Sequence, residues 1–198
     1  MPLYAKVVRI VKQQGATMRR NNESAVIVRG TARVLGQVDR DSWEHVERIN
    51  VSGVVCMVAV TPRNELILVE QYRAALRRAT IEIPAGLVGD IPGGEDEAFE
   101  AAATRELEEE SGYTASHMRF LSEGPTSSGI CSETIRFYRA EGVRKIGDGG
   151  GDHSEDIIVH IVPLAGIHDW LEKQTERGVF IDPKVYAALY FAGCGAPQ

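Results

Sequence analysis

The chain has 198 residues, enough for one domain or for one domain with a small appendage. Its formal net charge of -6, without a long basic cluster, argues against nucleic acid as the main partner, and 43% hydrophobic residues suffice for a core. No signal peptide and no apolar run of about eighteen residues is evident, so neither classical export nor membrane insertion is expected. Three widely spaced cysteines form neither a disulfide framework nor a zinc site, which fits a cytoplasmic protein.

The first part of the chain is β-rich. Three stretches with strand-forming residues, 4–11, 25–30 and 32–38, are separated by polar residues and predict strands. Their residue spacing alone indicates no chemistry. The plain interpretation is an appendage that packs on another surface, such as that of a second copy of the chain.

Signals for a sheet follow from residue 51. The apolar, β-branched run 51–60 predicts a buried strand, and 66–73 predicts its partner after a turn at Pro62. A short strand is predicted at 81–83, with Glu82 on the opposite face from its neighbours.

A turn is predicted at 84–86, ahead of a helix. Gly86 lets the backbone turn freely and would expose a carbonyl such as that of Ala85 to a ligand. Apolar residues at four-residue steps predict a helix over 95–111, and Gly112 is suited to cap its C-terminus.

This helix brings three carboxylates together. Glu106 and Glu110 lie one turn apart, Glu109 lies beside them, and Glu108 points elsewhere. Like charges repel, and the helix dipole disfavours anions at this end, so either the acidic face is merely solvated or a cation binds there. Oxygen ligands without a nearby Cys or His favour Mg²⁺ or Mn²⁺ over zinc.

Strands are predicted next at 117–121, 133–140 and 157–164, and helices at 166–177 and 182–192. Strands, one helix, more strands and two final helices predict an α/β protein with a mixed sheet between helical layers.

A glycine-rich segment, 145–152, predicts a mobile loop between two of these strands. His153, Glu155 and Asp156 follow it. A carboxylate at the end of a mobile loop resembles an active-site lid, and a flexible hairpin connection is the plain alternative.

The segment from Gly86 to Tyr113 resembles the Nudix box. The usual form of that motif is glycine, five residues, glutamate, seven residues, then Arg-Glu-apolar-x-Glu-Glu-x-Gly-apolar. Glu97 and Arg105–Tyr113 match it, whereas the expected glycine position falls on Ile91, so an insertion of five residues within 89–94 precedes the helix. The resemblance implies the Nudix fold, an α/β arrangement with a mixed β-sheet sandwiched between helices, here with an N-terminal β-rich appendage.

Flanking motifs resemble the ADP-ribose pyrophosphatase branch of the Nudix hydrolases. They are Glu70-Gln71-Tyr72-Arg73, Glu82-Ile83-Pro84-Ala85-Gly86, Ser128-Gly129-Ile130-Cys131-Ser132-Glu133 (Ser128 stands where proline is usual) and Glu155-Asp156-Ile157. The resemblance implies an N-terminal β-rich dimerisation segment, 1–48, and a Nudix hydrolase domain, 49–198. It further implies a homodimer.

The resemblance also implies metal and catalytic roles by position. Arg105 would pair with Glu97 and fix the loop against the helix. The general base stays open among Glu155, Glu109 and His153, with Glu155 as first choice because it follows the mobile loop. The catalytic set is then Glu109, Glu155 and Arg105, and the metal ligands are the Ala85 carbonyl, Glu106, Glu109, Glu110 and Glu155.

Three further residues are implied to bind substrate. Arg73 would bind the diphosphate, because guanidinium matches phosphate geometry. Glu82 would bind a ribose or the base, and Glu133 the distal sugar. For each, a surface or structural role is the alternative.

The implied function is Mg²⁺-dependent hydrolysis (Mn²⁺ a possible substitute) of a nucleoside diphosphate sugar, first of all ADP-ribose to AMP and ribose 5-phosphate. GDP-mannose, a dinucleoside polyphosphate or an oxidised nucleotide are alternative substrates. A sensor that binds ADP-ribose without cleaving it is a rival from a different class. It is disfavoured, because Glu106, Glu109 and Glu110 are all present and no room remains for a DNA-binding domain.

Overall fold

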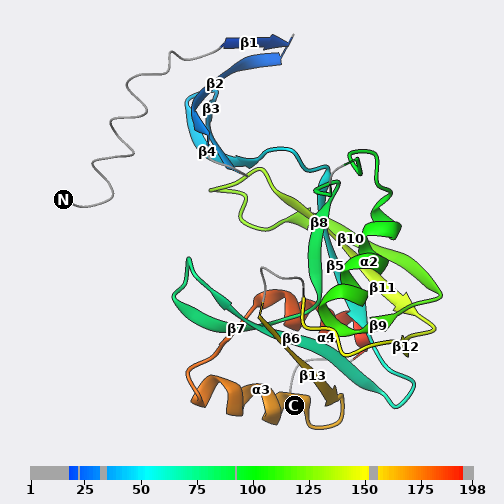
Figure 1. Cartoon of the computed structure of the whole chain (residues 1–198). Coiled ribbons are helices and arrows are strands. Elements are labelled where there is room, and N and C mark those ends of the chain that lie inside the picture. The colour runs from blue at the N-terminus through cyan, green and yellow to red at the C-terminus, as the bar shows by residue number, and fades with distance from the viewer. Residues whose placement is uncertain (1–17, 22, 32–34, 92, 152–155, 194–198) are drawn as a thin grey trace.

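The computed structural model describes residues 18–21, 23–31, 35–91, 93–151 and 156–193 (Figure 1). The predicted strand 4–11, the start of the predicted strand 32–38, and the site candidates His153 and Glu155 therefore lie outside the described residues.

The N-terminal strands form a sheet of their own at one end of the molecule (Figure 1). The strand order is β1 (Met18–Asn21), β2 (Glu23–Thr31), β3 (Leu35–Arg40) and β4 (Trp43–Arg48), and each strand is antiparallel to the next. The prediction of β-structure in this part is confirmed for β2 and β3. Strand β4 was not predicted, because Val46 is its only β-branched residue. It pairs with β3 through a two-residue turn at Asp41 and Ser42, both with positive φ, which is typical of a tight hairpin.

Two four-stranded sheets and a short strand pair form the body. In the first sheet the order is β10 (His117–Pro125), β11 (Thr134–Glu141), β5 (Gly53–Ala59) and β8 (Ala85–Val88). In the second it is β13 (Ile157–Pro163), β6 (Glu65–Arg73), β7 (Arg78–Glu82) and β14 (Phe180–Ile181). The short pair is β12 (Arg144–Lys145) with β9 (Tyr113–Thr114). Pairs β11–β5 and β14–β7 are parallel and the others antiparallel, so both large sheets are mixed, as expected.

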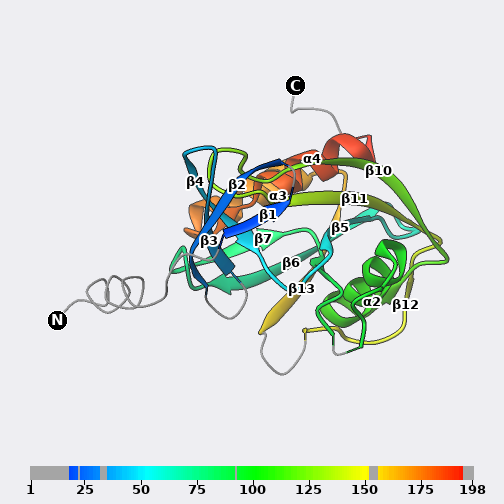
Figure 2. The same ribbon diagram turned by 90° about the horizontal axis from the view of Figure 1, so that it is seen from above.

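Helices cover both sides of these strands (Figure 2). Helix α2 (Phe99–Ser111) lies on one side, and α3 (Ile167–Glu176) and α4 (Pro183–Ala192) lie on the other. Strand β5 shows why: its alternate residues point to opposite faces, with Cys56 in the core under α3 and α4, and Met57 in the core under α2. The predicted sandwich is confirmed. Within the part of the chain described, no helix has the length and apolarity needed to cross a membrane.

Helix α2 begins at Phe99, later than the predicted 95–111. The residues before it turn back instead, with the Glu97 N–H donating to the Gly94 carbonyl at 2.8 Å. The end of the helix is as predicted, since Gly112 caps it with φ 71°.

The turn predicted at 84–86 is wrong from Ala85 onward. Residues Ala85–Val88 form strand β8, whose Ala85 pairs with Cys56 of β5. This pairing places β8 beside α2, and residues of β8 line the site described next.

Candidate active site

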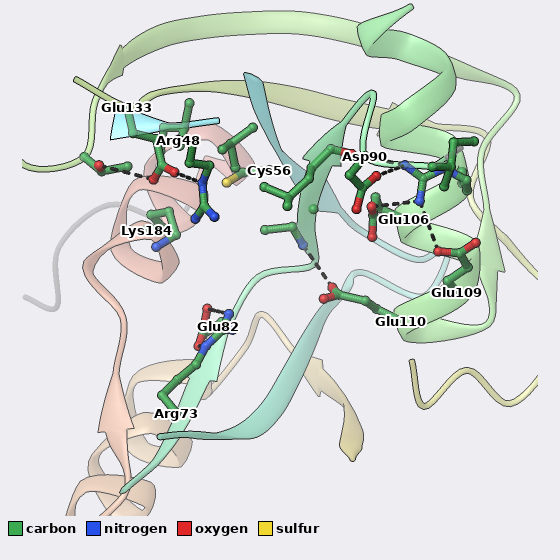
Figure 3. Close-up of a pocket in the computed structure, with 18 residues that line it drawn as sticks. Arg48, Cys56, Arg73, Glu82, Asp90, Glu106, Glu109, Glu110, Glu133 and Lys184 are labelled. Atoms are coloured by element: carbon green, nitrogen blue, oxygen red, sulfur yellow. Dashed lines mark hydrogen bonds and ion pairs between the residues drawn. The ribbon is translucent and has the colours of Figure 1, made fainter. Parts of the chain in front are cut away.

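A pocket of about 430 Å³ opens between α2, β8 and the ends of β6 and β7 (Figure 3). One end is acidic and is lined by side chains of α2, whereas the other carries cationic side chains from three separate elements. The α2 end carries Glu106, Glu109 and Glu110, together with Arg105 and Asp90, and the other end carries Arg48, Arg73 and Lys184, together with Glu82 and Glu133. Glu108, expected to point elsewhere, does not line it.

Strand β8 fixes two of the carboxylates. Glu110 is 3% exposed, and its Oε2 accepts a hydrogen bond from the Ala85 N–H at 2.9 Å. The carboxyl group of Glu106 lies against Gly86, where an added Cβ would come within 1.9 Å of the Glu106 Cδ. Only glycine therefore leaves room for Glu106 in this position, which is a physical reason for the glycine at the start of the motif.

Arg105 holds the loop and the helix together. Its Nε and Nη2 donate to the two carboxylate oxygens of Glu97 at 3.0 and 3.1 Å, so the predicted pair is confirmed. Its Nη1 also donates to Glu106 at 2.8 Å and to Glu109 at 3.2 Å, and its Nη2 to the Leu87 carbonyl at 3.1 Å. One guanidinium thus joins the loop, β8 and the acidic face of α2.

The charges at this end perturb one another. Burial raises the pKa of Glu106 to about 7, although the neighbouring Arg105 acts in the opposite direction. The hydrogen bond from Arg105 lowers the pKa of Glu97, and the same bond raises the pKa of Arg105. Ionisation of Glu106 therefore costs free energy in the absence of a cation.

The donor set suits a hard divalent cation. Among the described residues no three carboxylate, imidazole or thiol groups already converge as a metal cluster, since Glu106 and Glu109 both turn to Arg105. Glu106, Glu109, Glu110 and Ala85 nevertheless line the same end of one pocket, and they offer oxygen donors only. The residues present therefore fit Mg²⁺ or Mn²⁺. Glu155 lies outside the described residues.

The predicted substrate residues Arg73 and Glu82 form one unit. The guanidinium donates from Nε and Nη2 to the two oxygens of Glu82, at 2.6 and 2.7 Å, across the neighbouring strands β6 and β7. Glu82 is 4% exposed, whereas the Arg73 side chain is 42% exposed and lines the pocket. This geometry presents Arg73 to the pocket and makes Glu82 the group that orients it.

Glu133, predicted to bind a sugar, has a partner that the sequence did not indicate. Arg48, the last residue of β4, donates from Nε to its carboxylate, and the Thr126 hydroxyl donates to it at 3.4 Å. The N-terminal sheet thereby contributes a cation to the pocket. No sequence signal could have found Arg48, because its place depends on the unpredicted β4.

Lys184 was missed for a similar reason. It follows Asp182, the N-cap of α4, whose carboxylate accepts from the Lys184 backbone N–H at 2.7 Å and from its ammonium group. Its side chain is 24% exposed and reaches the pocket from the far end of the chain. Asp90, within the insertion, also lines the pocket and lies 3.4 Å from Arg105 Nη2.

The one thiol in the pocket lining is Cys56. Burial raises its pKa to about 12, so the thiol stays protonated near neutral pH and is not a nucleophile. Cys56 and Cys131 are both free.

Comparisons with known proteins agree with this geometry. A family model, the NUDIX domain, matches residues 51–189. The methanol dehydrogenase activator of Bacillus methanolicus is 35% identical over 144 residues, or 73% of this chain and 74% of that protein. The ADP-ribose pyrophosphatase of Bacillus subtilis (strain 168) is 33% identical over 144 residues, with the same coverage of both chains. A crystal structure of an ADP compounds hydrolase matches with a TM-score of 0.52 and 22% identity, over 80% of this chain and 84% of that one, and this bears on the fold alone.

Proposed function

Since this chain belongs to the Nudix family and is a pyrophosphatase, we propose that it cleaves the diphosphate of nucleoside diphosphate sugars and requires Mg²⁺ to do so. ADP-ribose is the proposed main substrate, with AMP and ribose 5-phosphate as products. The name of the similar protein from Bacillus subtilis supports this choice.

The observation that carries the proposal is the distribution of charged groups within the pocket between α2, β8 and the ends of β6 and β7. Its α2 end, with three glutamates, suits divalent cations, and its other end offers phosphate oxygens the N–H groups of Arg73, Arg48 and Lys184, each of which is held by a carboxylate. A diphosphate that carries a nucleoside and a sugar needs both. A cavity of about 430 Å³ lies within the usual range for small-molecule sites.

At the acidic end, we assign the metal to the Ala85 carbonyl and to Glu106, Glu109, Glu110 and Glu155. When bound, Mg²⁺ would neutralise the diphosphate and lower the pKa of an attacking water. Glu106 and Glu109 would turn from Arg105 toward the cation, and Arg105 would keep its two bonds to Glu97.

The remaining residues bind and orient. Arg73, held by Glu82, would donate both to that carboxylate and to the diphosphate. Glu133, fixed by Arg48, would accept from a sugar hydroxyl. Glu155 is the first candidate for the base that takes the proton of the attacking water, with Glu109 and His153 as alternatives.

The proposed assembly is a cytoplasmic homodimer formed through segment 1–48. The β1–β4 sheet exposes apolar side chains, with Trp43 62% and Leu35 42% exposed, which is consistent with burial against a second copy. Light scattering would test the dimer directly.

A substrate panel tests the function. Purified protein with Mg²⁺ would be given ADP-ribose, GDP-mannose, a dinucleoside tetraphosphate and the deoxynucleoside triphosphates, with a phosphatase coupled to release phosphate from the products. The highest kcat/KM is expected for ADP-ribose. Preference for GDP-mannose would keep the chemistry and change the substrate, whereas tight ADP-ribose binding without cleavage would favour the sensor.

A further inference from the structure

The glycine-rich segment 146–151 lies against the C-terminal end of α2, the helix that carries the carboxylates. Four of its backbone N–H groups donate to carbonyls there. Ile146 and Gly147 donate to the Gly112 carbonyl at 2.8 and 3.0 Å. Gly150 donates to the Glu110 carbonyl at 2.9 Å, and Gly151 to the Glu109 carbonyl at 3.0 Å. The segment expected to be a mobile loop is thus bonded to the helix end in this structure.

These bonds occupy carbonyls that a helix cannot pair by itself. The last four carbonyls of an α-helix have no partner within the helix, and the final turn frays without one. The Gly112 N–H pairs with the Glu108 carbonyl, and the glycine segment supplies donors for the next two, Glu109 and Glu110. The last turn of α2 has no basic residue, so these backbone dipoles supply partial positive charge beside its carboxylates.

The segment is held at both of its ends. Lys145, directly before it, pairs with Tyr113 in the short β12–β9 ladder. The Gly150 carbonyl accepts from the N–H of Ile157, the first residue of β13, at 3.3 Å. The helix end is therefore attached through the segment to two strands of the body.

Close approach of the two backbones requires glycine. At Gly149, where φ is +71°, an added Cβ would lie 2.4 Å from the Ser111 carbonyl carbon, 2.6 Å from the Gly112 nitrogen and 2.7 Å from the Glu110 oxygen. All three are backbone atoms, which cannot move without shifting the helix end. At Gly147, in contrast, an added Cβ would meet nothing within 4 Å, and φ is not positive.

We infer that segment 146–151 is a positioning element for the metal site, with Gly149 as its key residue, and this rests on the proposed metal ligands. It holds the backbone of Glu109 and Glu110 while the Ala85 N–H holds the Glu110 carboxylate. The last turn of α2 is restrained from both its main chain and its side chain. Displacement of the segment allows the two ligands to shift, although neither is itself changed.

The test compares Gly149→Ala with Gly147→Ala, which adds the same methyl group two residues away in open space. Binding of Mn²⁺ to substrate-free protein is measured by electron paramagnetic resonance, together with the melting temperature and the Mg²⁺ dependence of kcat. Gly149→Ala is expected to weaken Mn²⁺ binding by about tenfold, which is the usual effect of substituting a residue that orients metal ligands without binding the metal. Gly147→Ala is expected to stay within about twofold of wild type.

Wild-type Mn²⁺ affinity in Gly149→Ala, with only a lowered melting temperature, would overturn the inference and leave the proposed function intact. Absence of Mn²⁺ binding in the wild type would overturn the proposed function itself, and the inference with it. If Gly149→Ala does not fold, hydrogen exchange of the wild type decides. Because the coupling is reciprocal, Mn²⁺ must slow exchange of the Gly150 and Gly151 amides, and unchanged exchange would overturn the inference.

Discussion

At the scale of single residues, the site depends on a few side chains whose environments differ sharply. Glu110 is almost fully buried and bonded to β8, and burial raises the pKa of Glu106 to about 7. Arg73 is oriented by a buried partner, Glu82. Each of these environments makes a separate prediction.

Glu110→Gln is expected to lower kcat by about 10²-fold or more, because the substitution removes one proposed metal ligand and its charge. Glu108→Gln is the matched control, since Glu108 belongs to the same helix but does not line the pocket. Steady-state kinetics at saturating Mg²⁺ check both variants, with circular dichroism to verify the fold. Equal losses in the two variants would mean that the acidic face was wrongly identified.

The raised pKa of Glu106 predicts a pH dependence for the metal-free protein. The folded state binds the proton of the Glu106 carboxyl group more tightly than the unfolded chain does, so the contribution of Glu106 to the free energy of unfolding falls as pH rises from about 4.5 to about 7 and is constant above that. Urea unfolding in chelator across this range checks the slope, and Glu106→Gln should remove this contribution. The same slope in Glu106→Gln as in the wild type would contradict the assignment of this pH dependence to Glu106.

Because Mg²⁺ competes with the proton for the Glu106 carboxylate, the affinity of the protein for Mg²⁺ should rise with pH up to about pH 7.

Lys184 should act on substrate binding. Its ammonium group reaches the basic end of the pocket, and a hydrogen bond to a charged group contributes about 1.5–3 kcal/mol. Lys184→Ala is therefore expected to raise KM for ADP-ribose by about tenfold or more, with a smaller change in kcat. Lys173→Ala on the exposed face of α3 is the control. An unchanged KM in Lys184→Ala would remove this residue from the substrate site.

At the scale of elements, α2 is defined by its ends. Its C-terminus is capped by Gly112 and by the glycine segment, whereas its N-cap, Ala98, makes no side-chain hydrogen bond. Glu97, which could have served near this end, is instead bonded to Arg105 and to the Gly89 N–H. The start of the helix therefore lacks a stabilising contact that a small substitution can supply.

Ala98→Ser is expected to stabilise the protein by about 1 kcal/mol, because Ala98 is exposed and its extended backbone suits a capping side chain. For a chain of this size the melting temperature should rise by about 2–4 °C. Ala101→Ser, at an exposed position inside the same helix, should instead lower it slightly. Calorimetry of the two variants distinguishes a capping effect from a general effect of serine, which would shift both in the same direction.

At the scale of the whole molecule, the sequence was most informative where periodicity and a long motif coincide. Strands β5 and β6 and helices α3 and α4 lie within a few residues of their predicted positions. The motif also predicted the pair of Arg105 with Glu97. These features depend on neighbours in the sequence or on one extended pattern, so a single chain reveals them.

What could not be predicted depends on tertiary contacts. Ala85–Val88 forms a strand because β5 offers it a partner, and Arg48 and Lys184 line one pocket only because β4 ends and α4 begins beside it. The glycine segment seemed mobile from composition alone, since nothing in its sequence indicates the helix end that it contacts. Composition predicts the freedom of such a segment but not the surface on which it settles.

The proposed function is Mg²⁺-dependent hydrolysis of the ADP-ribose diphosphate at this pocket. The most direct measurement is mass spectrometry of the products formed from ADP-ribose in ¹⁸O-labelled water, with Mg²⁺ and with chelator. AMP and ribose 5-phosphate are expected, with one ¹⁸O atom in one of the two phosphates, and no products are expected in chelator. Intact ADP-ribose after prolonged incubation with Mg²⁺, or equal product formation in chelator, would contradict it.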